Sequence, residues 1–334
     1  MIIKVKNENK YNIVIEKNLL DNLGKHLSLY GKVLLSYDSN LPKELVEKVK
    51  KQFVNIYLFE VKAGEASKSL STYESMLKYL LGHEFSRKDH VIALGGGVVG
   101  DLTGFVASTF KRGLNFYNIP TTTLAMVDSS IGGKVALNLG DVKNAVGSFY
   151  NPKKVLIDVS VLESLPKRHF YNGLVEALKS GLIMDKKLYE IFLKDNYLDD
   201  LEKIIYLSLM VKKKVVEKDF KEENLRKILN FGHTFGHAFE SYYKMEGLLH
   251  GEAVACGMLY MIDYPTLKSN VINILKKMNI NYNIEFDKKQ IYKLVLNDKK
   301  TSNGYIDIVK VNLPGKYIIE KITLEELKNK LMGE

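Results

Sequence analysis

The first half of the chain alternates short apolar runs with longer amphipathic segments. Strand-like runs, rich in β-branched and aromatic residues, lie at 1–5, 33–36, 54–60, 91–94, 116–119 and 155–158. Helix-like segments lie between them, for example at 45–53 and 69–81. Strands that alternate with helices predict a mostly parallel sheet covered on both faces. The predicted fold class is therefore α/β.

The second half has a different pattern. From about residue 162 the periodicity is mainly helical, until a strand-like run at 306–309. A chain of 334 residues is long enough for about two domains. We therefore expect a boundary near 160, with an α/β domain over residues 1–160 and a mainly helical domain over residues 161–334.

Composition excludes several classes of protein. Hydrophobic residues make up 46%, but no apolar run approaches the ~18 residues of a membrane helix. A single cysteine excludes an internal disulfide and favours a reducing cytoplasm. The net charge of +10 raises the possibility of nucleic-acid binding, but the lysines are dispersed and no basic patch with interleaved aromatic residues appears. We therefore expect a cytoplasmic protein with no membrane or nucleic-acid partner.

Three of the seven histidines lie between positions 233 and 250. His233 and His237 are four residues apart, so on a helix they share one face. Gly232 and Gly236 precede them and would let a cofactor or a second helix approach closely. Neutral imidazole is a common metal ligand, and three protein ligands with an open position are typical of catalytic zinc. The cluster, with His250, predicts a metal site, and two packed helical histidines are the alternative.

An apolar segment at 172–180 carries two charges. Glu176 and Lys179 are three residues apart and face the same way on a helix. Charges in an apolar segment need partners, and a salt bridge between these two would serve. Because of the histidine cluster, Glu176 is also a candidate metal ligand.

A glycine-rich turn follows the apolar run at 91–94. Gly95, Gly97 and Gly100 satisfy G-x-G-x-x-G between a strand and a predicted helix that continues to Phe110. In that context the motif predicts a dinucleotide pyrophosphate at a helix N-terminus. The match is imperfect, since no acidic residue ends a strand about twenty positions later. A turn that serves only tight packing is the alternative.

A third segment, 120–134, is rich in threonine, serine and glycine. Asp128, Lys134, Lys143 and Asn144 add charged and amide groups within or just after it. Many backbone and hydroxyl donors beside lysines are suited to a polar, anionic small molecule. A long surface loop is the alternative, but the segment lacks the lysine and glutamate typical of one.

These motifs together resemble the 3-dehydroquinate synthase family of sugar-phosphate cyclases. The similarity runs from about Asp38 to about Lys299, and its motifs are GEASK at 64–68, GGGVVGD at 95–101, TFKRG at 109–113, PTTTLAMVDSSIGGK at 120–134, KN at 143–144, NGLVEALK at 172–179, LRKILNFGHTFGHAFE at 225–240 and HGEAVACGM at 250–258. The narrower assignment within the superfamily rests on Lys179, Lys212, Arg226 and Asn230.

The resemblance implies conversion of 3-deoxy-D-arabino-heptulosonate 7-phosphate to 3-dehydroquinate and phosphate, in the shikimate pathway. NAD oxidises the C5 hydroxyl, which permits loss of phosphate, and the same cofactor then reduces the ketone before ring opening and an intramolecular aldol step. A divalent metal, Zn²⁺ or Co²⁺, polarises the hydroxyl and the carbonyl. The first domain would bind NAD, the second would bind metal and substrate, and the protein would be a homodimer.

The resemblance also implies roles for individual residues. The metal ligands are Glu176, His233 and His250, and His237 handles protons; spacing alone favoured His233 with His237. The catalytic residues are Asp128, Lys134, Asn144, Lys179 and His237. The substrate-binding residues are Lys212 and Arg226 for the carboxylate, and Asn230, Lys299 and a neighbouring subunit's Arg112 for the phosphate side. The NAD-binding residues are Asp38, Asn40, Glu65, Lys68, Gly95, Gly96, Gly97, Asp101, Thr121, Thr122 and Lys143.

The sequence departs from the family pattern in two places. Thr123, Met126 and Val135 replace residues usual in the family, which we interpret as variation in the pocket wall. After Met258 the helical stretch is shorter, and Pro265 is expected to break a helix. Two other activities remain open: a cyclase that acts on another sugar phosphate, and a metal-dependent polyol dehydrogenase.

Overall fold

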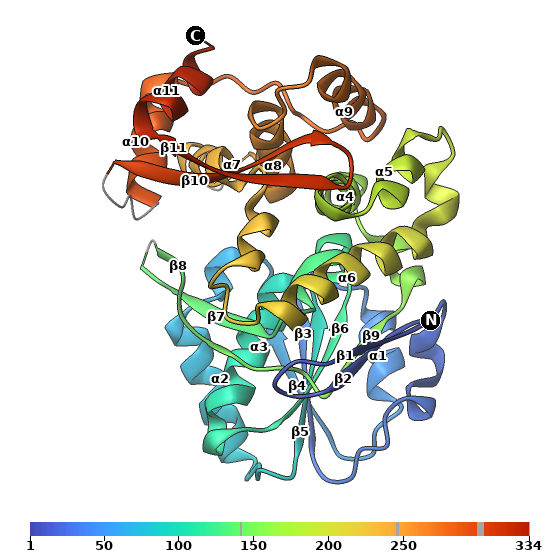
Figure 1. The fold of residues 1–334 in the computed structure, drawn as a ribbon. Helices are drawn as coiled ribbons and strands as arrows, with labels where there is room; N and C mark the ends of the chain where they lie inside the picture. Colours follow the sequence, from blue (N-terminus) through green and yellow to red (C-terminus); the bar gives the residue numbers. More distant parts are fainter. Residues whose placement is uncertain (141, 245–246, 299–303, 334) are drawn as a thin grey trace. The chain divides into compact units, whose positions relative to one another are not determined.

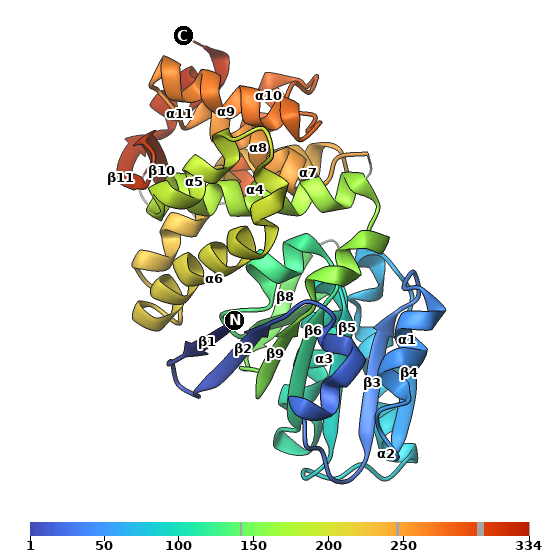
Figure 2. The same ribbon diagram turned by 90° about the vertical axis from the view of Figure 1, so that its right-hand side faces the viewer.

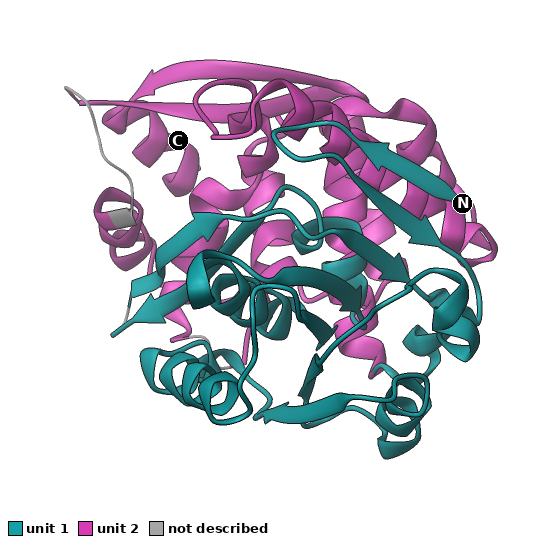
Figure 3. Ribbon diagram, turned by 90° about the horizontal axis from the view of Figure 1, so that it is seen from below, with its two compact units in different colours: residues 1–165 teal, residues 166–334 magenta. Residues whose placement is uncertain are grey.

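The computed structural model describes residues 1–140, 142–244, 247–298 and 304–333. The chain forms two compact units, residues 1–165 and 166–334, which Figure 3 shows in teal and magenta. Because unit 1 is built on a mostly parallel sheet and unit 2 is mainly helical, the predicted α/β fold class is confirmed.

Unit 1 contains a seven-stranded sheet in the order β1-β2-β9-β6-β5-β3-β4. Only β1 and β2 pair in antiparallel fashion, and the other neighbours are parallel, side by side in Figure 2. The strands are β1 (Ile2–Val5), β2 (Tyr11–Ile15), β3 (Val33–Asp38), β4 (Ile56–Val61), β5 (His90–Gly95), β6 (Asn115–Pro120) and β9 (Lys154–Ile157).

Helices of unit 1 connect these strands. They are α1 (Lys43–Lys50), α2 (Leu70–Gly82) and α3 (Gly97–Thr109), with shorter turns η1 (Leu19–Lys25), η2 (Glu65–Ser67), η3 (Phe110–Arg112) and η5 (Val159–Ser164). Leu34 of β3 and Val91 of β5 belong to a core cluster with Met76 of α2 and Leu102 of α3. Their neighbours along the strands, such as Leu35, point to the opposite face and are fully buried as well. Burial of both faces explains the continuous apolar runs in the sequence.

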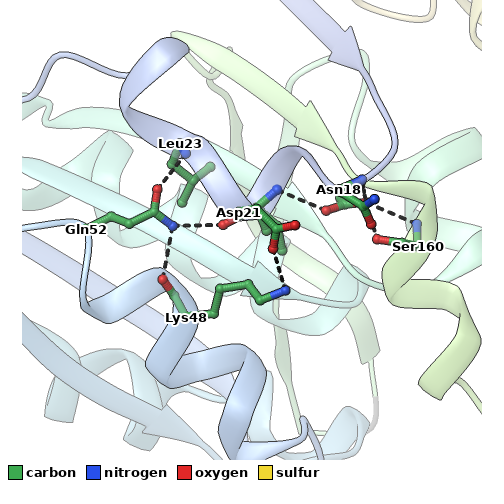
Figure 4. A network of polar contacts seen from close by, with 8 residues as sticks. Asn18, Asp21, Leu23, Lys48, Gln52 and Ser160 are labelled. Atoms are coloured by element: carbon green, nitrogen blue, oxygen red, sulfur yellow. Dashed lines mark hydrogen bonds and ion pairs between the residues drawn. The ribbon is translucent and has the colours of Figure 1, made fainter.

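A polar network on η1 and α1 ties together segments that are far apart in the sequence (Figure 4). Gln52 donates to the carbonyl oxygens of Leu20 (2.7 Å) and Lys48 (3.0 Å) and accepts from the Leu23 amide (2.6 Å). The buried Asp158 accepts from the amides of Asn18, Leu20 and Ser160. These contacts satisfy backbone groups of a 3₁₀ turn that its own hydrogen bonds leave unpaired.

The segment after β6 is more regular than its sequence predicts. A π-helical turn, η4 (Ala125–Ser129), leads into an antiparallel hairpin of β7 (Lys134–Leu139) and β8 (Val142–Phe149). The sequence pattern predicts a ligand-binding loop over residues 121–144, and these two strands were not predicted. Apolar residues in these strands are interrupted irregularly by glycine, asparagine, lysine and serine, so no two-residue period is visible.

Unit 2 is mainly helical (Figure 1). Its helices are α4 (Lys167–Met184), α5 (Lys186–Leu193), α6 (Leu201–Lys218), α7 (His233–Tyr242), α8 (His250–Tyr260), α9 (Pro265–Lys277), α10 (Lys288–Asp298) and α11 (Leu324–Met332), with the turns η6 (Tyr197–Asp200) and η7 (Leu225–Asn230). A hairpin of β10 (Tyr305–Leu313) and β11 (Lys316–Thr323) precedes α11. Helix α8 ends before Pro265, and Pro265 begins α9, so the predicted break is confirmed.

Helix α4 lies at the centre of unit 2. Every residue from Asn172 to Ile183 is buried, because α5, α6, α8 and β11 pack around the helix. A helix buried on all sides is expected to be apolar all round. The exceptions, Glu176 and Lys179, are therefore the charges of this unit that most need explanation. Within the described residues, no helix is long and apolar enough to span a membrane.

Candidate metal centre and nucleotide site

Three helices of unit 2 bring one carboxylate and two imidazoles together. Glu176 comes from the middle of α4, His233 is the first residue of α7, and His250 is the first residue of α8. One ligand atom from each lies within 4.8 Å of the others. Oε1 of Glu176 is 3.5 Å from Nε2 of His250 and 3.7 Å from Nε2 of His233.

This geometry suits a divalent metal better than it suits hydrogen bonds. Ligand atoms ~2.0–2.1 Å from a tetrahedral ion lie roughly 3.3–3.4 Å from one another, which is close to the observed separations. The same distances are long for hydrogen bonds. Both oxygens of Glu176 are inaccessible to solvent and lack a hydrogen bond of normal geometry among the described residues, although one lies against Nζ of Lys179. The donor set and its spacing therefore fit a metal ion.

Glycines allow α7 and α8 to approach closely. Gly232 has a left-handed backbone (φ +80°) just before His233, and a Cβ on Gly257 would lie 1.9 Å from the carbonyl oxygen of Gly232. A Cβ on Gly236 would touch Val254 at 3.3 Å. The prediction that glycine admits a second helix is therefore confirmed, and that helix is α8.

Gly257→Ala is expected to lower the free energy of unfolding by about 1–3 kcal/mol or more, because the methyl group has no space beside the backbone of Gly232. Urea denaturation measures the change. Gly82→Ala is the matched control, since a Cβ at the end of α2 meets nothing within 4 Å. Equal midpoints for the two variants would contradict the close helix contact.

Glu176 and Lys179 form an ion pair across one turn of α4, and both side chains are almost fully buried. Burial alone would raise the pKa of the Glu176 carboxyl, but the charge of Lys179 and the two histidines outweigh it and hold that pKa well below its usual range. Lys179 also donates to the carbonyl oxygen of Leu229 at 2.7 Å. The pair keeps an anion in place among the candidate metal ligands.

The two candidate imidazoles have opposite environments. Burial and the nearby Lys179 hold the pKa of His233 well below its usual value, so this ring is neutral. Burial opposes protonation of His250 too, but contacts with Glu176 and Glu240 raise its pKa to about 10. Glu240 Oε2 lies 3.4 Å from Nδ1 of His250, which leaves Nε2 directed toward Glu176. Such a carboxylate orients a metal-binding imidazole.

Sequence reasoning missed Glu240. It lies at the end of the His-Ala-Phe-Glu sequence, three residues after His237, and is a buried acidic residue on an apolar helix. An acidic residue so close to His237 was the one sequence feature that could have indicated a role for Glu240. His237 itself lies outside the cluster of ligand atoms, and its ring packs edge-on against His233 with centroids 5.2 Å apart.

Residues assigned to the substrate carboxylate are buried in unit 2. Arg226, on η7, donates from Nη1 to the carbonyl oxygen of Phe220 at 2.6 Å. Lys212 lies on α6, which contacts η7, and is also buried. Asn230 ends η7 and donates to Glu222 at 3.4 Å. Lys299 lies outside the described residues.

In unit 1 the glycine-rich turn joins β5 to α3. A Cβ on Gly95 would lie 2.8 Å from Val99, and one on Gly96 would lie 3.1 Å from Thr122. One on Gly97 would lie 3.3 Å from Ser129. The turn packs too closely against these residues to accept side chains of its own, and no side chain caps α3. Free amides at a helix N-terminus fit a pyrophosphate.

A buried lysine organises the residues beside this turn. Nζ of Lys68 contacts Oδ2 of Asp101 at 2.6 Å and also donates to Asn144. Asn138 joins Glu65 to these residues, because its side chain donates to Glu65 (2.8 Å) and accepts from the Asn144 amide (2.9 Å). Four residues predicted from the sequence therefore lie in one network. Asn138 was not predicted, since a lone asparagine on a strand gives no local signal.

The remaining predicted residues of unit 1 lie on several elements. Asp38 ends β3 and accepts from the Asn40 amide at 2.9 Å. Thr121 and Thr122 follow β6, Asp128 lies on η4, Lys134 begins β7 and Lys143 lies on β8. Arg112 is exposed and, with Lys111, has a left-handed backbone (φ +67° and +46°).

Cys256 is expected to react with a maleimide only when the protein unfolds. The thiol is buried on α8, and burial raises its pKa to about 12, so the reactive thiolate is scarce at pH 8. Mass spectrometry of labelled protein with and without denaturant measures this. Rapid stoichiometric labelling of the folded protein would contradict the packing of α8.

Comparison with known families gives two matches. The 3-dehydroquinate synthase N-terminal model matches residues 58–172, and the C-terminal model matches residues 173–301. A 3-dehydroquinate synthase from Clostridium acetobutylicum is 39% identical over 340 residues, covering 96% of this chain and 95% of the relative.

Solved structures with the same fold include two synthases. A 2-deoxy-scyllo-inosose synthase complexed with carbaglucose-6-phosphate, NAD⁺ and Co²⁺ has a TM-score of 0.89 at 24% identity, covering 99% of each chain. A 2-epi-5-epi-valiolone synthase from Streptomyces hygroscopicus, with NAD⁺ and Zn²⁺ bound, has a TM-score of 0.87 at 24% identity, covering 99% of this chain and 98% of the other. The matched models span most of the chain and the curated relative spans nearly all of it, so this chain belongs to the 3-dehydroquinate synthase family.

Proposed function

We propose that this protein converts 3-deoxy-D-arabino-heptulosonate 7-phosphate to 3-dehydroquinate and inorganic phosphate, with regenerated NAD and a divalent metal. The observation that carries the proposal is the Glu176–His233–His250 cluster in a chain of the 3-dehydroquinate synthase family. The one buried cysteine is compatible with the cytoplasm, where we place the reaction.

Glu176, His233 and His250 would hold Zn²⁺ or Co²⁺, since both ions accept this set of ligands. A bound divalent ion supplies Lewis acidity at the substrate oxygen atoms. Lys179 maintains the ionised state of Glu176, and Glu240 sets the orientation of the His250 ring. His237, whose ring packs against His233, would accept or donate a proton beside the ligands.

The glycine-rich turn and α3 would bind NAD through the pyrophosphate. NAD supplies a reversible hydride acceptor. Lys68 and Asp101 hold the neighbouring hairpin in place through Asn144, and Asp38 at the end of β3 offers a carboxylate for ribose hydroxyls. Thr121, Thr122 and Lys143 complete the proposed NAD site.

Substrate recognition divides between the two anionic groups of the heptulosonate phosphate. Buried Arg226 and Lys212 suit its carboxylate, because the guanidinium offers a rigid fork of donors. Lys134, Asn144, Asn230 and Lys299 are assigned to the phosphate side, and Asp128 and Lys179 to hydroxyl groups. The family resemblance assigns Arg112, which is exposed on a turn with a left-handed backbone, to the site of a second copy in a homodimer.

NAD recycling tests the proposal. With the heptulosonate phosphate and trace NAD, we expect many equivalents of phosphate per NAD and no steady rise of NADH absorbance. Phosphate and NADH are followed in one cuvette. Stoichiometric NADH formation with glycerol-like substrates, without phosphate release, would overturn the proposal and favour a polyol dehydrogenase.

A further inference from the structure

Three residues on successive turns of α4 contact three consecutive residues at the start of α8. Arg168, Asn172 and Glu176 are spaced by four residues, so they lie on one face of α4. They contact Glu252, Gly251 and His250 respectively. These contacts fix the register between the two helices. The last of them joins two candidate metal ligands, Glu176 and His250.

Asn172 caps the N-terminus of α8, because the residue that precedes α8 does not. Leu249 precedes α8 and its side chain has no polar atom to accept from the first amides. Oδ1 of Asn172 instead accepts from the Gly251 amide at 2.6 Å and lies 3.3 Å from the Glu252 amide. The cap comes from the helix that carries Glu176, about one turn before it, so one contact both caps α8 and places a candidate ligand.

The contacts on either side of the Asn172 cap hold the first turn of α8 firmly against α4. A Cβ on Gly251 would lie 2.0 Å from the carbonyl oxygen of Asn172, so the two backbones touch. The buried Glu252 accepts from Nε (2.8 Å) and Nη2 (2.7 Å) of Arg168 and from the Leu249 amide (2.8 Å). A bidentate pair of this kind fixes orientation as well as distance.

We propose that Asn172 is a positioning residue for the metal: its carboxamide oxygen fixes the first turn of α8 against α4 and so sets the separation of His250 from Glu176. The inference rests on the proposed metal site. Asn172 does not touch the metal in this account. It acts through the backbone of Gly251, next to His250.

The test measures Co²⁺ binding to chelator-treated full-length protein. Asn172→Leu removes the acceptor and keeps the number and branching of the side-chain heavy atoms; it is expected to weaken Co²⁺ binding about 10- to 100-fold, with an altered visible spectrum of the bound ion. Asn172→Asp keeps an acceptor at the helix N-terminus and should retain near wild-type affinity and spectrum. If Asn172→Leu fails to fold, Asn172→Ser, whose hydroxyl is too short to reach, should show the same loss.

Leu331→Ala is the control for a purely structural effect, because Leu331 is buried on α11, outside the three ligand-bearing helices. It should lower thermal stability without changing Co²⁺ affinity or spectrum. Wild-type affinity and spectrum in Asn172→Leu or Asn172→Ser would overturn the positioning role and leave the metal site intact. A wild-type protein that bound no Co²⁺ would overturn the metal site and the positioning role together.

Discussion

His250→Ala is expected to remove bound metal and to lower kcat/KM by at least about 10³-fold. Lewis-acid stabilisation of a developing charge is worth several kcal/mol, and ~1.4 kcal/mol is one decade of rate. Glu176→Gln should have the same effect and should also destabilise the fold, because it leaves Lys179 as a buried charge without its anion. Elemental analysis and steady-state kinetics measure both effects.

The matched control for the ligand variants is His169→Ala, an exposed histidine on the same helix as Glu176. It should keep full metal content and activity. Added Zn²⁺ or Co²⁺ should restore activity to chelated wild-type protein but not to His250→Ala. Full activity of a metal-free preparation would refute the assigned role of these three residues.

Arg226→Ala is expected to lower kcat/KM for the heptulosonate phosphate by roughly 30- to several-thousand-fold. Removing one partner of a desolvated charge pair costs about 2–5 kcal/mol, at ~1.4 kcal/mol per decade. Arg226→Lys should recover only part of the loss, because a point charge does not reproduce the bidentate fork.

The control for Arg226 is its neighbour Lys227, whose half-exposed side chain pairs with Asp307 on the surface at 3.0 Å. Lys227→Ala should leave kcat/KM almost unchanged. Metal content and NAD affinity should be normal in both Arg226 variants, since neither ligand uses the guanidinium. Intact turnover of the acid substrate by Arg226→Ala would show that this residue does not bind the carboxylate.

Local patterns were sufficient for most of the sheet. The buried parallel strands β3, β5 and β6 were recognisable as short, largely apolar runs because both of their faces are covered. The β7–β8 hairpin was missed, because its strands carry asparagine, glycine and lysine at positions that no periodic pattern marks. The structure supplies what the pattern lacked, namely the antiparallel pairing of β7 with β8.

The candidate metal site depends on contacts between helices, which a pattern along the sequence does not reveal. Spacing along one helix favoured His233 with His237. It does not reveal that α8 approaches α7 through Gly257 and so brings His250 close to Glu176. The same limit applies to Glu240, Asn172 and Asn138. Each acts through a partner on another element, and a single polar residue in an apolar segment does not identify that partner.

Substrate preference tests the central claim most directly. The measurement compares kcat/KM for 3-deoxy-D-arabino-heptulosonate 7-phosphate, sedoheptulose 7-phosphate and glucose 6-phosphate, with NMR identification of the products. Because Arg226 and Lys212 are buried cations assigned to a carboxylate, we predict turnover of the acid substrate to 3-dehydroquinate and little or none of the other two. Preferred turnover of either carboxylate-free sugar phosphate, or no formation of 3-dehydroquinate, would contradict the account.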